Sequence, residues 1–128
     1  MIQYKNETGT VLFDPQVFAM IAMDTAVQKE EIYAVTNSRG KVIRQKENGK
    51  ESLNFIEVLP SEESYSVDLR IYVVLNFGKS ISAAADEFGR LLRERIRMIT
   101  GVSVGDLTMV VTGVRSRKIA RRDLEIQC

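Results

Sequence analysis

The stretch VDLRIYVVLNFGKSI, residues 67–81, decides the fold. Apolar residues alternate with other residues over positions 65–77, which is the pattern of a strand with one buried face. The opposite face becomes apolar at Tyr72 and Val74, so the strand is expected inside a sheet rather than at its edge. Gly78 then separates the strand from a second pattern.

That second pattern predicts a long helix from Ser80 or Ser82 to Thr100, followed by Gly101 as a C-terminal stop. Its apolar residues recur at three- and four-residue steps. The expected buried stripe consists of Ile81, Ala85, Phe88, Leu92, Ile96 and Ile99. A further strand is predicted over residues 102–114.

The chain before this region predicts one more helix and several short strands. Asp14 and Pro15 are typical of an N-cap and a first helical residue, so a helix is expected from Pro15 to about Val27. Short strands are expected over residues 10–13, 31–36 and 53–59, and a less regular one over 41–45.

The composition indicates one globular domain of 128 residues with 45% hydrophobic content. Eighteen basic and seventeen acidic residues give a net charge of +1, which provides no general attraction to nucleic acid or to an anionic membrane. The single cysteine, Cys128, excludes an internal disulfide framework and suits a reducing compartment. The N-terminus lacks the pattern of a signal peptide, and the apolar runs are too short to span a bilayer.

Residues that could support catalysis are few. The chain has no histidine, which removes the usual general base near neutral pH and any histidine-based metal site. The Gly78-Lys79-Ser80 tripeptide resembles the end of a phosphate-binding loop, but Val73 stands where such a loop requires its first glycine. We therefore expect no enzyme, no cofactor and no metal.

Basic residues suggest one candidate interaction surface on the second helix and after the last strand. If the two groups come together they form a positive surface; otherwise they are an ordinary solvated helix face and a basic tail. No aromatic residue lies in the tail, which weakens the alternative of a nucleic-acid-binding domain without excluding it. The candidate residues are Arg90, Arg93, Arg97, Arg115, Arg117, Lys118, Arg121 and Arg122.

Three stretches carry a family resemblance: GTVLFDPQVFAMIAMDTAV at 9–27, VDLRIYVVLNFGKSI at 67–81 and RIRMITGVSVGDLTMVVTGV at 95–114. Their order resembles the alkaline shock protein family, a group of envelope stress response proteins from Gram-positive bacteria. The sequence departs from the family pattern over residues 41–52, and its basic residues after Val114 lie outside the shared domain.

The resemblance implies an α+β domain in which two helices cover one face of a mainly antiparallel sheet, in the order β-α-β-(β)-β-β-α-β. On this basis residues 1–114 form the domain, with 37–52 as a variable loop or hairpin, and 115–128 form a basic tail. The implied function is a non-enzymatic interaction or assembly module of the envelope stress response. Expected partners are a membrane-anchored or soluble protein, such as a relative from the same family, or further copies of the chain. The implied location is the cytoplasm, at the inner face of the cell membrane and without a membrane span.

Overall fold

The computed structural model describes residues 2–6, 9–42, 56–60, 66–76, 78, 80–116 and 119–128. Two helices and a mixed sheet of five strands confirm the predicted α+β class. The elements are, in chain order, β1 (Ile2–Asn6), β2 (Gly9–Phe13), α1 (Pro15–Val27), β3 (Ile32–Thr36), β4 (Ile56–Pro60), β5 (Ser66–Asn76), α3 (Ile81–Thr100), β6 (Ser103–Arg115) and β7 (Ile119–Gln127).

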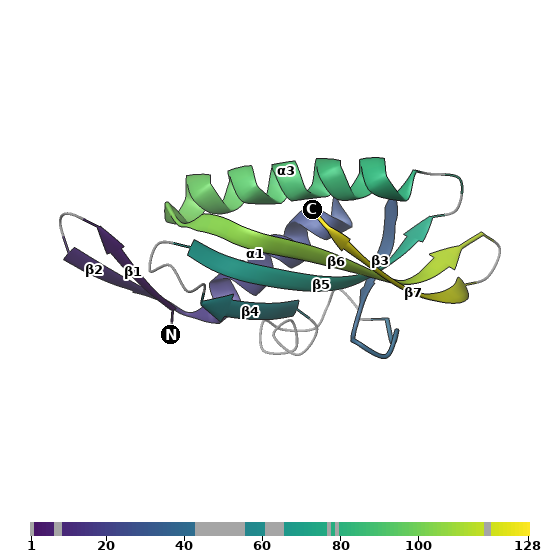
Figure 1. Cartoon of the computed structure of the whole chain (residues 1–128), viewed down its shortest axis with the longest axis horizontal. Coiled ribbons are helices and arrows are strands. Elements are labelled where there is room, and N and C mark those ends of the chain that lie inside the picture. Colours follow the sequence, from purple (N-terminus) through teal and green to yellow (C-terminus); the bar gives the residue numbers. More distant parts are fainter. Residues whose placement is uncertain are drawn as a thin grey trace.

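Strand β5 is the centre of the sheet, as its two apolar faces predict (Figure 1). β3 and β4 pair with its two halves along one edge, β6 pairs along the other edge, and β7 lies beyond β6. Among the described strands, only the β5–β6 pair is parallel, because α3 carries the chain back between them. The sheet is therefore mainly antiparallel, as expected.

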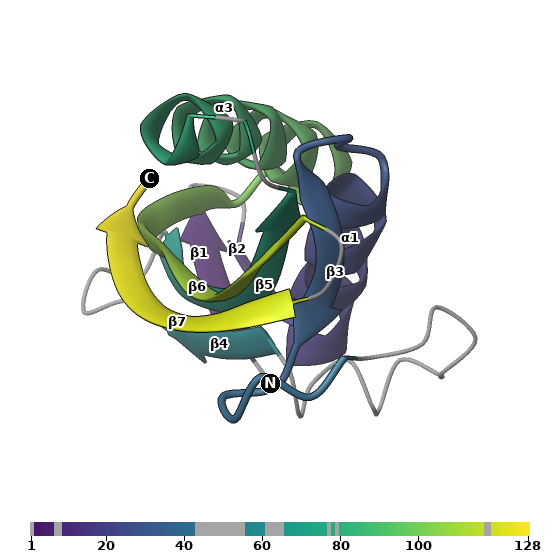
Figure 2. The same cartoon turned by 90° about the vertical axis from the view of Figure 1, so that its right-hand side faces the viewer.

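Both helices cover the same face of the sheet, and the core lies between the two layers (Figure 2). Phe18 from α1 and Phe88 from α3 are fully buried there, together with the odd-numbered residues of β5 from Val67 to Leu75. On the other face of β5, Tyr72 and Val74 are also buried. This burial confirms that the strand is apolar on both sides along its second half.

The predicted helix after Gly78 is confirmed, with well-defined ends. The Ser80 hydroxyl accepts a hydrogen bond from Ala83 N at 3.3 Å, and Gly101 donates to Arg97 O at 2.9 Å from a left-handed conformation (φ 78°). Most of the predicted stripe is buried. Ile99 is the exception: it is 60% exposed, so its predicted burial is wrong.

A tight turn follows β3. The Asn37 side chain accepts hydrogen bonds from Arg39 N and Lys41 N, each at 2.9 Å, and the turn returns the chain so that Val42 forms an isolated bridge with Thr36. This bridge is the described part of the strand expected at 41–45. The rest of that strand, and residues 43–52 of the variable segment, lie outside the described residues.

Part of the segment predicted as a basic tail belongs to the sheet. β7 runs antiparallel to β6, with Arg115 opposite Ile119 and Met109 opposite Ile126. Its position beside β6 gives β6 a partner on both sides. The sequence did not predict this strand.

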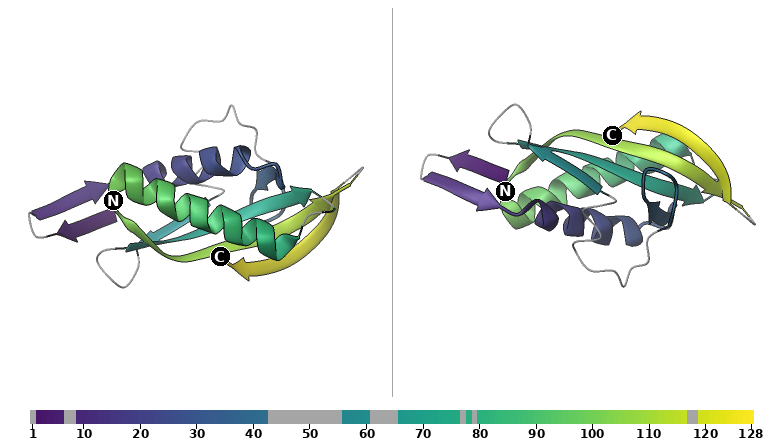
Figure 3. Two further views of the ribbon diagram at one scale, coloured as in Figure 1. Left: turned by 90° about the horizontal axis from the view of Figure 1, so that it is seen from above. Right: turned by 90° about the horizontal axis from the view of Figure 1, so that it is seen from below.

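The strands β1 and β2 form a separate two-stranded sheet, which the sequence predicted only at β2. In Figures 1 and 3 this hairpin projects beyond the body of the domain, at the end where α1 begins and α3 finishes. It is attached to the body through Asp14, which caps α1 by accepting a hydrogen bond from Gln16 N at 2.9 Å.

Candidate functional site: the helix layer and its apolar end

Polar contacts fix the two helices relative to each other. Arg95 on α3 bonds the Asp24 carboxylate at 2.7 Å and the buried Thr25 hydroxyl at 3.1 Å on α1. Further along, Lys29 contacts Glu87 at 3.3 Å. Residue numbers therefore increase along α1 in the direction in which they decrease along α3, so the two helices are antiparallel.

Arg93 is half-buried and connects α3 to two other backbone segments, the start of β6 and the residue after β7. Its guanidinium donates to Val104 O at 2.6 Å, to Gly105 O at 2.9 Å and to Cys128 O at 3.0 Å. The planar, five-donor guanidinium suits such a cluster of carbonyl groups. This residue of the candidate surface therefore stabilises the fold, and its charge is already engaged.

Cys128 packs tightly against α3. A Cβ atom placed on Gly89 would lie 2.8 Å from the Cβ atom of Cys128, so only glycine allows this approach. The backbone N–H of Cys128 also donates to Leu107 O at 2.8 Å. Burial raises the pKa of the Cys128 thiol, so the reactive thiolate is less populated near neutral pH than for an exposed cysteine.

The outward face of α3 carries charges of both signs. Arg90 and Arg97 are exposed on it, and they alternate with acidic residues along the helix. This alternation is typical of a solvated helix face. The exposed charged residues of α3 are Asp86, Glu87, Arg90, Glu94 and Arg97, which gives an acidic excess of one.

The remaining basic residues are elsewhere. Arg115 lies at the far end of β6, where its guanidinium stacks on Tyr33 with 4.3 Å to the ring centroid. Since α3 runs antiparallel to β6, Arg97 and Arg115 are at opposite ends of the domain. Arg117 and Lys118 lie outside the described residues. Arg121 and Arg122 are in β7, and their side chains are not described.

A polar network lies on the sheet face away from the helices. Arg70 makes two hydrogen bonds to Glu125 of β7, at 3.0 and 2.8 Å, and a third to the Tyr72 hydroxyl at 3.1 Å. Tyr72 in turn donates to Glu57 of β4 at 3.1 Å. The bonds to Arg70 lower the pKa of Glu125, and those to Glu125 and Tyr72 raise the pKa of Arg70 further above its usual range. The network therefore connects β4, β5 and β7.

Three large apolar side chains of the two helices are more than half exposed. Met98 is 78% exposed, Ile99 60% and Met20 54%. Arg95 contacts Asp24, and the helices are antiparallel, so the turn after Arg95 lies near the turn before Asp24. Ile99 and Met98 belong to the last turn of α3 and Met20 to the first half of α1, and Figure 3 shows the end of α3 and the start of α1 at the same end of the domain. We refer to these three residues as the apolar patch.

The apolar patch was not among the residues suggested by the sequence. The helical periodicity gave a partial indication, because Ile99 continues the apolar stripe of α3 by one more turn. Sequence spacing could not show that Ile99 itself remains exposed.

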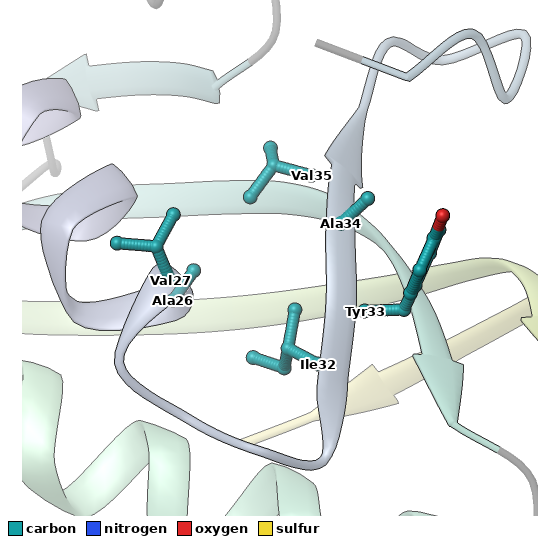
Figure 4. Close-up of a pocket in the computed structure, with 6 residues that line it drawn as sticks. All are labelled: Ala26, Val27, Ile32, Tyr33, Ala34 and Val35. Carbon is teal, nitrogen blue, oxygen red and sulfur yellow. The ribbon is translucent and has the colours of Figure 1, made fainter. Parts of the chain in front are cut away.

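A small pocket lies at the other end of α1, next to β3 (Figure 4). Its volume is about 60 Å³, well below the roughly 300–1,000 Å³ of small-molecule sites. The Tyr33 hydroxyl is the single polar side-chain group among the lining residues, and Figure 4 shows the Tyr33 ring turned away from Val27. The lining residues are Ala26, Val27, Ile32, Tyr33, Ala34 and Val35.

Within the described ranges, no cluster of three or more acidic, cysteine or histidine side chains could hold a metal ion. No helix in that part of the chain is long and apolar enough to cross a membrane.

The fold and its surfaces define a small α+β domain whose most distinct external feature is an apolar patch on the helix layer. The chain belongs to the alkaline shock protein 23 family, described as having a cell envelope-related function, whose family model matches residues 3–116. The match ends just after β6, so β7 lies beyond it. No curated protein and no solved structure matches the chain.

Proposed function

We propose that the protein is a non-enzymatic interaction and assembly module of the cell envelope, held at the cytoplasmic face of the membrane by a protein partner. The observation that carries this proposal is the apolar patch. The cell envelope-related function of the family supports the location, and the resemblance seen in the sequence supports the protein partner.

The composition of the patch favours a protein as its ligand. Met98, Ile99 and Met20 expose more than half of their surfaces, although single exposed apolar residues are common on proteins. Their grouping on two helices is what is unusual. Methionine is enriched in protein interfaces, where its flexible thioether adapts to a partner surface. Arg97 and Asp24, beside the patch, provide the charged rim that such interfaces have.

Nucleic acid binding is the competing function. It requires a continuous basic surface that follows phosphates. On α3, Arg90 and Arg97 are interspersed with acidic residues, and Arg93 is engaged with backbone carbonyls. These observations favour the protein-interaction proposal over the nucleic-acid alternative.

The test is purification of the tagged full-length protein from membrane and other cell fractions, with and without nuclease. We expect a protein that accompanies it from the membrane fraction and resists nuclease. The Ile99→Lys variant should recover much less of that partner. Val27→Lys is a matched control, because Val27 is an exposed apolar residue of α1 (41%) at the opposite end of the helix layer. Recovery of nucleic acid that nuclease removes, without a protein partner, would refute the proposal.

A further inference from the structure

A surface that the proposed function does not use lies at the other end of α1 from the apolar patch. There the pocket of Figure 4 lies between the last turn of α1 and β3. Two of its lining residues are well exposed, Val27 at 41% and Tyr33 at 43%, so the pocket is reached from solvent. We call it the β3 pocket; its lining residues are Ala26, Val27, Ile32, Tyr33, Ala34 and Val35.

The size of the β3 pocket fits one small aliphatic group. An apolar cavity of about 150 Å³ admits a benzene ring, which has six carbons. On that scale the β3 pocket, at about 60 Å³, has room for roughly two or three carbons. The end of a valine or leucine side chain has this size. The pocket therefore suits a single side chain of another protein.

The walls of the β3 pocket are held in place by the core. Ala26, Ile32 and Val35 belong to the buried core cluster. The Ile32 N–H donates to Lys29 O at 3.1 Å, which fixes the short connection between α1 and β3. An occupant would therefore enter a preformed space, and little of its binding energy would be used to order the protein.

A cationic group lies beside the pocket. The Arg115 guanidinium stacks on the Tyr33 ring, with 4.3 Å between Arg115 Cζ and the ring centroid. Arg115 is exposed, and it forms no ion pair with an acidic side chain of the described residues. The acidic residue closest to Tyr33 in sequence, Glu31, lies 4.0 Å from the Lys29 ammonium instead. A guanidinium stacked on an aromatic ring keeps the N–H groups at its edge available to a carboxylate.

We propose that the β3 pocket and Arg115 form a docking site for an acidic peptide segment of a partner protein, with an aliphatic side chain in the pocket and a nearby carboxylate on Arg115. The pocket supplies an apolar anchor, and the cation fixes the orientation of the segment. Tyr33 connects the two contacts, because it lines the pocket and its ring carries the guanidinium. The site is separate from the apolar patch and goes beyond the proposed function, since one copy of the chain can hold a second protein there.

The pocket is the feature that selects a protein segment. The phosphates of a nucleic acid or of a lipid headgroup would also pair with Arg115. Neither presents a small branched aliphatic group beside its charge. A peptide with valine or leucine near aspartate or glutamate presents both groups, and its charge is complementary to that of Arg115.

The test is an NMR titration of the purified, ¹⁵N-labelled full-length protein with short peptides that are acetylated and amidated at their ends. Each peptide has one valine and one glutamate, adjacent or separated by one, two or three glycines, in both orders. Matched peptides carry lysine in place of glutamate, or serine in place of valine. We expect the amide signals of the β3 pocket and Arg115 to shift with at least one glutamate peptide, with a dissociation constant of about 1 mM. The matched peptides should bind at least about fivefold more weakly.

Charge reversal tests the role of Arg115. In the Arg115→Glu variant the lysine peptide should bind about fivefold more tightly than the glutamate peptide, and this gain also shows that the variant is folded. Arg90→Glu, the same change at an exposed arginine of α3, should leave the preference for glutamate unchanged. Val27→Ser, which removes an aliphatic part of the pocket wall, should weaken the glutamate peptide about threefold.

The absence of shifts in the β3 pocket up to about 10 mM peptide would overturn the inference, as would equal binding of the glutamate and lysine peptides. Binding to phosphatidylglycerol vesicles that Arg115→Glu abolishes, without peptide binding, would assign the arginine to a lipid headgroup and would also overturn it. These failures are distinct from a failure of the proposed function. Arg115→Glu should leave recovery of the membrane partner unchanged, whereas Ile99→Lys should reduce it. Loss of that partner with both variants would refute a separate site.

Discussion

Replacement of Gly89 by alanine tests the packing of Cys128 against α3. In an ordinary helix interior the change stabilises the protein by about 0.5–1 kcal/mol, because glycine is the poorer helix former. Here the added Cβ atom would lie 2.8 Å from the Cβ of Cys128, so Cys128 must move. This movement would weaken or break the two hydrogen bonds of Cys128, which donates to Leu107 O at 2.8 Å and accepts from Arg93 at 3.0 Å.

The expected magnitude follows from these opposing contributions. Loss of two hydrogen bonds costs about 1–3 kcal/mol, at 0.5–1.5 kcal/mol each. The gain in helix propensity offsets part of this loss. Gly89→Ala is therefore expected to lower the free energy of unfolding by about 1 kcal/mol, with a range of roughly 0–2.5 kcal/mol.

The same substitution should have the opposite sign when Cys128 is glycine. Without the Cβ of Cys128, the next nearest atoms of that residue are 3.4 and 3.6 Å from the added Cβ, close to ordinary contact distance. In the Cys128→Gly background, Gly89→Ala should then stabilise the protein by about 0.5–1 kcal/mol.

Equilibrium urea unfolding of the four proteins in this double-mutant cycle measures the coupling between the two positions. The reasoning predicts a coupling of at least about 1 kcal/mol. A stabilising effect of Gly89→Ala in both backgrounds, with coupling within about 0.3 kcal/mol, would mean that β7 does not lie against α3 as the structure describes.

Two further predictions concern single side chains. Glu125→Gln should destabilise the protein above the ordinary glutamate pKa of about 4.3, because Arg70 lowers the pKa of Glu125 in the folded state. This difference from the wild type should disappear as pH falls through the lowered pKa of Glu125; urea unfolding between pH 3 and 7 checks it, and a pH-independent difference would contradict it. Arg93→Lys should lower the free energy of unfolding by about 1.5–3 kcal/mol, because one ammonium cannot replace a guanidinium that bonds three carbonyl groups. Arg90→Lys, on the exposed face of α3, should change it by no more than about 0.5 kcal/mol. Equal effects of the two lysine substitutions in thermal unfolding would contradict the assigned role of Arg93.

Arg93 illustrates why interaction surfaces are harder to predict from sequence than helices and strands. The sequence grouped it with Arg90 and Arg97, because the three share a helix and a charge. In the structure, Arg93 turns toward β6 and Cys128, while Arg90 and Arg97 remain in solvent. Helical spacing gives the direction of a side chain around its own helix. It does not give the acceptors that a neighbouring strand presents.

Ile99 shows the same limit for apolar residues. Its spacing from Ile96 and Leu92 is that of a buried position, and both of those residues are fully buried. Ile99 is 60% exposed although Ile96 before it and Val102 after it are buried in the core. The length of a helix can be read from its caps, but the extent of the core beneath it depends on the other layers.

The sequence by itself determined the two helices, the central strand and the α+β class. Each of these depends on local patterns: the alternation over β5, the three- and four-residue steps over α3, and the capping residues Asp14, Ser80 and Gly101. Tertiary structure alone decided the pairing of β7 with β6, the engagement of Arg93 and the exposure of the apolar patch. Those features depend on contacts between residues distant in the sequence, such as Arg93 with Cys128, and local periodicity carries no information about such contacts.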